Sequence, residues 1–121
     1  MSFRMLALSF LILSLIGCST VRVEPLGNVA LPTVRTTGGI PTVFKSRAEV
    51  TQPAIEVAVL TLNGQGYGLS EIASKFQVKA AQIGADGIIL QEKNPEAENE
   101  RDRFLDGSRA TAVAISFRRP R

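Results

Sequence analysis

The sequence predicts an α+β fold, in which a small three- to four-stranded sheet carries one packed helix in the order strand-strand-helix-strand-strand. Three observations lead to this prediction. Short segments rich in β-branched residues lie between Pro, Gly and Asn residues. One longer segment has apolar residues at helical spacing. The chain of 121 residues is long enough for one domain.

Along the chain we expect a signal peptide at residues 1–17, a lipidated cysteine and flexible linker at 18–40, and a small α/β periplasmic domain at 41–121. Residues 1–4 contain Arg4, the only charged side chain of the first twenty residues. The apolar run that follows, residues 5–16, suits a signal peptide and is too short to span a membrane, which takes about 20 residues.

The apolar run ends in Leu15-Ile16-Gly17-Cys18, which resembles the lipobox of bacterial lipoprotein precursors. The resemblance implies cleavage between Gly17 and Cys18 and acylation of Cys18, with palmitate among the attached chains. Ser19 occupies the position where Asp implies inner-membrane retention in enteric bacteria, so we expect an outer-membrane protein facing the periplasm. A plain signal peptide with an incidental cysteine is the alternative.

Residues 19–40 contain several Pro and Gly residues and no sustained period, which is typical of a flexible linker. An alternative stays open here, in which Val21-Arg22-Val23 or Val29-Ala30-Leu31 docks as an additional edge strand.

We expect strands at Pro41–Ser46 and Ile55–Leu62, the second of which is apolar on both faces and therefore central. The glycine-rich segment that follows, Asn63–Gly68, matches neither the dinucleotide-binding nor the Walker spacing, so we interpret it as a turn. A helix is predicted at 70–83. Ser70 is its expected N-cap, its core stripe is expected to contain Ile72, Phe76, Ala80 and Ile83, and Gly84 ends it.

After the helix we expect a short buried strand at Ile88–Gln91, a charged connection at 92–109 and a last strand at Thr111–Phe117. The short links favour a parallel strand–helix–strand crossover, with antiparallel placement left open. The connection contains acidic residues without the order of a calcium-binding loop, and is interpreted as solvated: Glu92, Glu96, Glu98, Glu100, Asp102 and Asp106. Arg118, Arg119 and Arg121 are expected to solubilise an edge or touch anionic headgroups.

The composition excludes several kinds of site. With no His and one Cys, the chain holds no zinc or redox site built from His and Cys and no internal disulfide. Without residues 1–17 it carries 13 basic and 11 acidic side chains, too even a balance to predict nucleic-acid binding. We therefore expect no catalytic residue, metal or cofactor, and no enzyme. Glu92 and Glu96 form a carboxylate pair, but they lie in the charged connection without a predicted pocket.

The predicted helix and the strand after it contain the pattern K-A-x-x-x-G-A-[DN]-x-[VI]-[VIL], matched by Lys79, Ala80, Gly84, Ala85, Asp86, Ile88 and Ile89. This pattern and the order of parts resemble the RcsF-like sensor lipoproteins of the Rcs envelope-stress pathway over roughly residues 41–118. The disulfide cysteines of that family are missing here. The resemblance implies a related fold and an outer-membrane location.

Two functions follow from these observations. The first is a non-enzymatic sensor or binding module, attached to the membrane through its lipid anchor and contacting an envelope protein. The second is a structural or assembly accessory that self-associates or joins an envelope complex. For the second, Ile55, Val57 and Val59 are expected to make the uncovered sheet face apolar.

Overall fold

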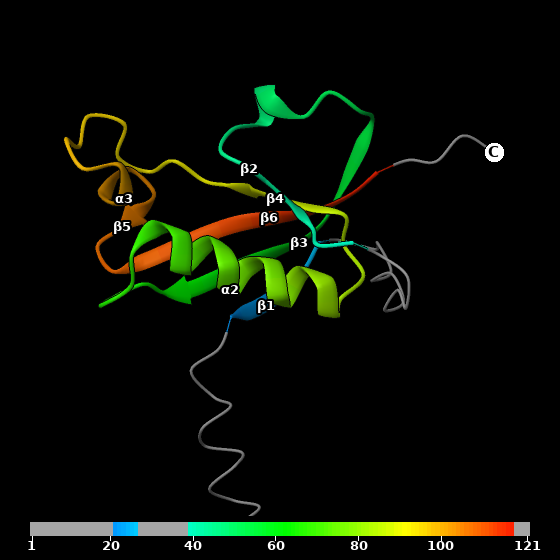
Figure 1. The fold of residues 1–121 in the computed structure, drawn as a ribbon, viewed down its shortest axis with the longest axis horizontal. Helices are drawn as coiled ribbons and strands as arrows, with labels where there is room; N and C mark the ends of the chain where they lie inside the picture. Colours follow the sequence, from blue (N-terminus) through cyan, green and yellow to red (C-terminus); the bar gives the residue numbers. More distant parts are fainter. Residues whose placement is uncertain (1–20, 27–38, 118–121) are drawn as a thin grey trace, which may run out of the picture.

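The structure, a computed structural model, describes residues 21–26 and 39–117. Its six strands form one mixed sheet in the order β1-β3-β6-β4-β2, with β5 paired to β6, and the helix α2 lies across one face (Figure 1). The elements are β1 (Arg22–Pro25), β2 (Thr42–Phe44), the 3-10 turn η1 (Arg47–Glu49), β3 (Ala54–Asn63), α2 (Leu69–Gln82), β4 (Gly87–Leu90), α3 (Glu100–Arg103), β5 (Leu105–Asp106) and β6 (Arg109–Phe117).

The predicted sheet of three to four strands is wrong, because the fold, although broadly α+β, contains six. One additional strand, β1, lies in the predicted linker and pairs antiparallel with β3. It corresponds to the edge strand left open at residues 21–23, whereas residues 29–31 lie outside the described residues. The other, β5, lies in the predicted charged connection, where a turn at Gly107 folds it back onto β6.

Strand β1 belongs to the sheet because its apolar side chains alternate with charged ones. Val21 is buried and Val23 packs against the core, while Arg22 and Glu24 point to the opposite face and are exposed. The predicted domain boundary at residue 41 leaves this strand out.

Strands β3 and β4 both pair antiparallel with β6, so they run parallel to each other with β6 between them. The helix α2 makes the connection from β3 to β4 across this intervening strand. The arrangement answers the question that the sequence left open: the crossover is parallel, although the two strands it joins do not pair directly.

The core lies between α2 and the sheet. Ile72, Phe76 and Ala80 are the buried residues of the helix, and they face fully buried small side chains of β6, Ala112 and Ala114. Small residues let the helix approach the sheet closely. The helix begins one residue earlier than predicted, with Gly68 rather than Ser70 at its N-cap.

The motif after α2 has a structural role. Gly84 ends the helix with a positive φ of 77°, which favours glycine. The carboxylate of Asp86 accepts hydrogen bonds from the Phe117 backbone N–H at 2.8 Å and from the Ser116 hydroxyl at 3.3 Å. The residues of this motif therefore hold the end of the helix against the end of β6.

A β-bulge in β3 corrects the prediction that Ile55, Val57 and Val59 share one face. The pairing with β6 shifts between Glu56 and Ala58, so the alternation of side chains is interrupted there. Val57 is consequently buried in the helix-side core and Ile55 packs against that core. Val59, which pairs with Val113, faces the other side of the sheet.

Replacing Gly87 by alanine should lower the free energy of unfolding by about 1–2 kcal/mol, as overpacking does. A Cβ at this position would lie 3.0 Å from Phe44 Cε2 and 3.1 Å from the Thr42 carbonyl oxygen, and this crowding exceeds the gain from removing a flexible glycine. Urea unfolding measures the change. Gly39→Ala is the control, because a Cβ there meets nothing within 4 Å; equal effects at both positions would contradict the packing.

Candidate functional surface

The predicted cleavage and lipidation residues, Gly17 and Cys18, lie outside the described residues, as do Arg118, Arg119 and Arg121. Val21 is the described residue that follows Cys18 most closely along the chain. Within the described ranges, no helix has the length and apolar character needed to cross a membrane.

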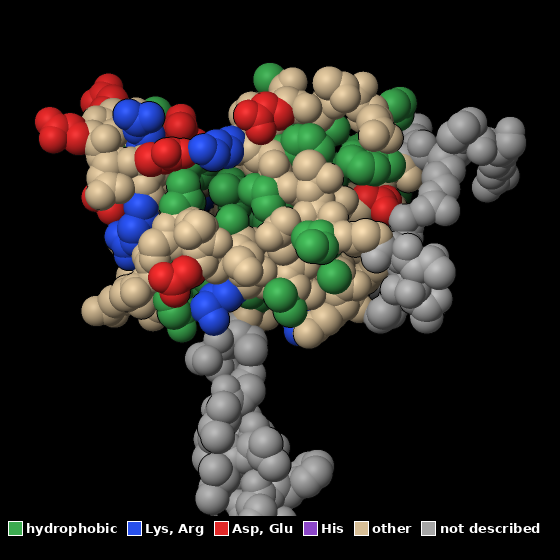
Figure 2. All heavy atoms as spheres, in the orientation of Figure 1, with side chains coloured by type: hydrophobic (Ala, Val, Ile, Leu, Met, Phe, Trp, Pro, Cys, Tyr) green, Lys and Arg blue, Asp and Glu red, His purple; other side chains and the backbone are tan. Residues whose placement is uncertain are grey.

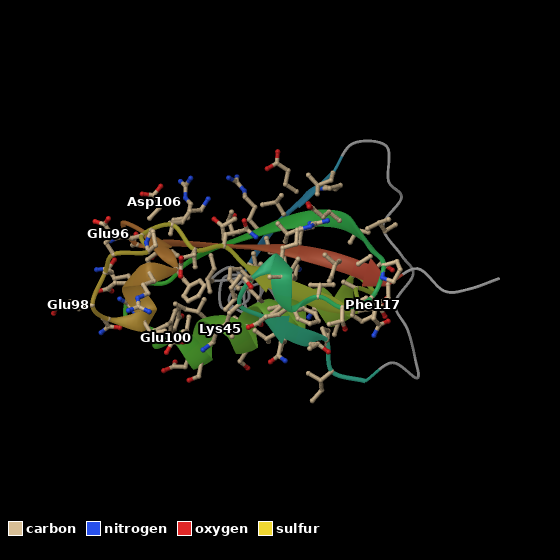
Figure 3. The ribbon with its side chains drawn as sticks, turned by 90° about the horizontal axis from the view of Figure 1, so that it is seen from above. Lys45, Glu96, Glu98, Glu100, Asp106 and Phe117 are labelled. Atoms are coloured by element: carbon tan, nitrogen blue, oxygen red, sulfur yellow. The ribbon has the colours of Figure 1, made fainter. Side chains whose placement is uncertain are left out.

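The acidic residues of the predicted charged connection project from the sheet. Figure 2 shows acidic side chains gathered at the upper left, over the loop that carries α3, with basic side chains among them. Glu96 and Glu98 point outward from this loop (Figure 3). Among residues 39–117 and 21–26, no three acidic side chains come close enough together to hold a metal ion.

One acidic side chain of this loop reaches the rest of the fold. Glu100 forms an ion pair with Lys45, which follows β2, and so links the loop to a segment 55 residues away in sequence. The hydrogen bond between them, and secondarily their charge attraction, lower the pKa of Glu100 and raise the pKa of Lys45. Both side chains are exposed, so the pair is screened by salt and orients the loop more than it stabilises the domain.

Titration of Glu100 should therefore give a pKa below the usual 4.5 of a glutamate. Because the pKa is lower in the folded state, the contact stabilises the fold at pH values above the usual pKa of a glutamate. This stabilisation is lost as the pH falls through the lowered pKa. Carboxyl-carbon NMR measures this pKa in the native chain. It should return to its usual range in Lys45→Met and in high salt, whereas Lys93→Met is the charge-matched control; an unchanged value in Lys45→Met would contradict the pair.

The glycine-rich segment 63–68 is held by an arginine. Arg101 in α3 donates from Nε to the Tyr67 carbonyl at 2.5 Å and from Nη2 to the Gly64 carbonyl at 2.9 Å. Carbonyl oxygens of this segment thus converge on a cation, whereas a phosphate-binding loop turns its N–H groups toward an anion. Gly64 is also tightly packed, since a Cβ there would lie 3.0 Å from Ile72 Cδ1. This segment joins α2 to α3 and is structural.

The sheet face opposite α2, here called the open face, is covered over one half. The segment from Lys45 to Pro53 lies over β4 and the end of β6, where Ile89 and Ile115 are 4% and 1% exposed. Arg47 in this segment forms an ion pair of 2.5 Å with Glu56 of β3. A hollow of about 310 Å³ remains beside it, with Ile89 and Val113 in its lining.

The other half of the open face carries half-buried side chains from neighbouring strands. Val59 and Thr61 of β3 pair in register with Val113 and Thr111 of β6. Each pair of partners points to the same side of the sheet. This half therefore presents a mixed apolar and hydroxyl surface.

One end of the open face carries two arginines and is called here the arginine end, defined by Arg22, Asn63, Ser108 and Arg109. These residues line a hollow of about 260 Å³ together with Thr61 and Leu62. Arg22 and Arg109 form no ion pair with any side chain in the described ranges. The arginine end is thus a polar depression with two cationic groups that are not ion-paired with any described side chain.

Sequence reasoning missed the contacts of Arg22, Arg101 and Arg109. For Arg22 a signal was present, because Val21-Arg22-Val23-Glu24 alternates apolar and charged residues as a half-buried strand does. Arg101 and Arg109 offered no such signal, since their partners are distant in sequence.

No protein-family model, curated protein or solved structure matches this chain.

Proposed function

We propose that this chain is the precursor of a bacterial lipoprotein, cleaved before Cys18 and anchored in the outer membrane through lipid on that residue. The observation that carries the proposal is the segment Leu15-Ile16-Gly17-Cys18 after a 12-residue apolar run, in which Cys18 is the only cysteine of the chain. Two or three acyl chains on one residue make membrane attachment effectively permanent. The folded part acts in the periplasm.

Within this proposal the folded part is a non-enzymatic sensor or binding module. Support comes from the half of the open face beyond the segment from Lys45 to Pro53, where Val59 and Val113 remain half-buried and Val113 lines the hollow of about 310 Å³. Surfaces of this composition, apolar in the centre and charged at the edge, suit contact with another protein. The motif from Lys79 to Ile89 resembles one in the Rcs stress-sensor lipoproteins. On this resemblance, the binding role that we propose is the sensing of envelope stress.

Photo-crosslinking in intact cells tests the binding role. A photoreactive residue at Val113 should capture an envelope protein, and the yield should change when the envelope is stressed. Val78 is the control position, because it is 57% exposed but lies on α2, away from the open face. Equal adducts from both positions, or none from Val113 at rest and under stress, would count against the proposal.

The second candidate is an assembly accessory that self-associates. The specific observation in its favour is that β1 pairs with only four of the ten residues of β3, so no described strand lies beside the rest of that edge of β3. Edge strands pair readily with other chains. Sedimentation of the detergent-solubilised lipoprotein at several concentrations tests this: a monomer throughout would exclude self-association and leave the first candidate.

A further inference from the structure

We infer that the arginine end lies directly on the membrane surface, where Arg22 and Arg109 bind the phosphate groups of anionic phospholipids. This inference rests on the proposed lipidation of Cys18. It concerns how the folded part is oriented and which headgroups it contacts, neither of which the lipid anchor alone determines.

The length of the tether is the first argument. Strand β1 begins at Arg22 and is fixed to β3 by backbone pairing, so the segment between lipid and fold ends there and not at residue 41. Cys18 and Arg22 are four residues apart, a distance of at most about 14 Å in any conformation. The headgroup region of one leaflet is itself about 5–7 Å thick. The arginine end therefore cannot leave the neighbourhood of the headgroups.

The placement of the two arginines is the second argument. Arg22 of β1 pairs with Thr61, and Arg109 of β6 pairs with Asn63, so both lie on the open face on either side of β3. Strands two positions apart are about 10 Å apart, and the two-residue offset between Thr61 and Asn63 adds about 7 Å along the strand. The two Cα atoms are therefore about 12 Å apart, a separation that two long side chains can close on one phosphate. Guanidinium groups bind phosphate through paired N–H donors.

The hollow also contains neutral hydrogen-bond donors. Ser108 and Asn63 line it, and among the described residues the side chain of Asn63 uses only its Oδ1, which accepts from the Gln65 N–H at 3.0 Å. Donors of this kind commonly accompany arginine in the recognition of phosphate oxygens.

The positions of the acidic groups influence how the folded part is oriented on the membrane surface. Asp106 stands opposite Arg109 in the β5–β6 pair and Glu24 is two residues from Arg22, but neither lines the hollow. The acidic side chains of residues 92–103 lie on the loop with α3, which joins the start of β6 through β5, on the side of β6 away from β3 and β1 (Figure 1). Repulsion from an anionic surface therefore tilts the domain so that β1 and Arg22 lie closer to the lipid than this loop does.

The test uses the complete lipidated protein, with Gln65→Cys as its only free thiol, because Cys18 is consumed by lipid. Gln65 is exposed and lies beside Asn63 without lining the hollow. A fluorophore on this thiol is measured in phosphatidylethanolamine vesicles with and without phosphatidylglycerol, each containing a headgroup-quenching lipid. Quenching should rise with phosphatidylglycerol. Each arginine-to-glutamine change, at Arg22 or Arg109, should reduce the population in contact about fivefold.

Two further variants should not reduce quenching as the arginine changes do: one should increase it and the other should leave it unchanged. Asp106→Asn should increase quenching, because it removes the acidic group opposite Arg109. The double variant Lys79→Gln and Lys93→Gln removes two positive charges elsewhere and should leave quenching unchanged. Equal losses from the lysine and arginine variants would mean that total charge is responsible, and would overturn the inference.

A flexible Gly/Ser spacer tests the tether. Inserted between Thr20 and Val21, it should reduce quenching; inserted between Thr37 and Gly38, it should not, because β1 already holds the fold near the lipid. Equal effects of the spacer at both sites would overturn the inference. It would also be overturned if vesicles without phosphatidylglycerol gave quenching that inorganic phosphate abolishes, because the arginine end would then bind phosphate without needing an anionic phospholipid. Failure of the chain to incorporate palmitate would instead refute the proposed function, so the two failures are distinguishable.

Discussion

Cys18→Ser should abolish lipid attachment and either release the protein from the membrane or leave an uncleaved precursor. The effect is expected to be all-or-none, because the thioether to the lipid needs a thiol and the chain has no second cysteine. Labelled palmitate measures incorporation directly, and membrane fractionation measures release. The fold should be unaffected, since the described sheet begins after this residue, at Arg22.

Ser19→Asp is the matched control for this experiment. It leaves Cys18 in place, so labelled palmitate should enter as in the native protein, while in an enteric host the anchored protein should move from the outer-membrane to the inner-membrane fraction. Palmitate in the Cys18→Ser variant would refute the proposed lipoprotein. Palmitate in neither the native chain nor the Ser19→Asp variant would refute it as well.

Local sequence pattern was sufficient for the long elements of the fold. The helix stripe at Ile72, Phe76 and Ala80 predicted α2 to within one residue at either end, because a 3.6-residue period over 14 residues has few competing interpretations. Strand β3 was likewise recognisable from its β-branched run between Pro53 and Asn63. These are properties of neighbouring residues and need no knowledge of the rest of the chain.

Pairing between distant segments was not predictable in the same way. The bulge between Glu56 and Ala58 arises from how β3 fits β6, and nothing in β3 alone indicates it. The two-residue strand β5 exists because Leu105 and Asp106 fold back on Ala110 and Arg109. Six alternating positions in a row give a clear strand signal, whereas two give none.

The candidate surface was less predictable than the fold. The hollow at the arginine end combines β1, β3 and β6, whose residues are up to 87 positions apart between Arg22 and Arg109. The lipidation residue was predictable, because the lipobox consists of adjacent residues that can be recognised without knowing the fold. The contrast reflects whether a site is built from adjacent residues or assembled by folding.

A chain that begins at residue 41 should be less stable than one that begins at residue 21, by roughly 2–4 kcal/mol. The estimate counts the full burial of Val21, about 1.5–3 kcal/mol, and roughly half of that value for Val23, which is only partly buried against the core. A small domain has only about 5–15 kcal/mol in total. Urea unfolding of the two chains measures the difference.

Removing β1 also changes which strand forms the edge of the sheet. The backbone groups of β3 that pair with Arg22–Pro25 would then face solvent, and an unpaired strand of ten residues invites association between chains. The shorter chain should therefore sediment as larger species, while the longer one should not.

Within the longer chain, Val23→Ala should lower the free energy of unfolding by about 1–2 kcal/mol, because buried apolar groups are lost. Glu24→Gln should leave it unchanged because Glu24 is exposed. Equal stability of the two chains would mean that β1 is part of the tether and not of the domain, and the short distance between lipid and fold would no longer hold.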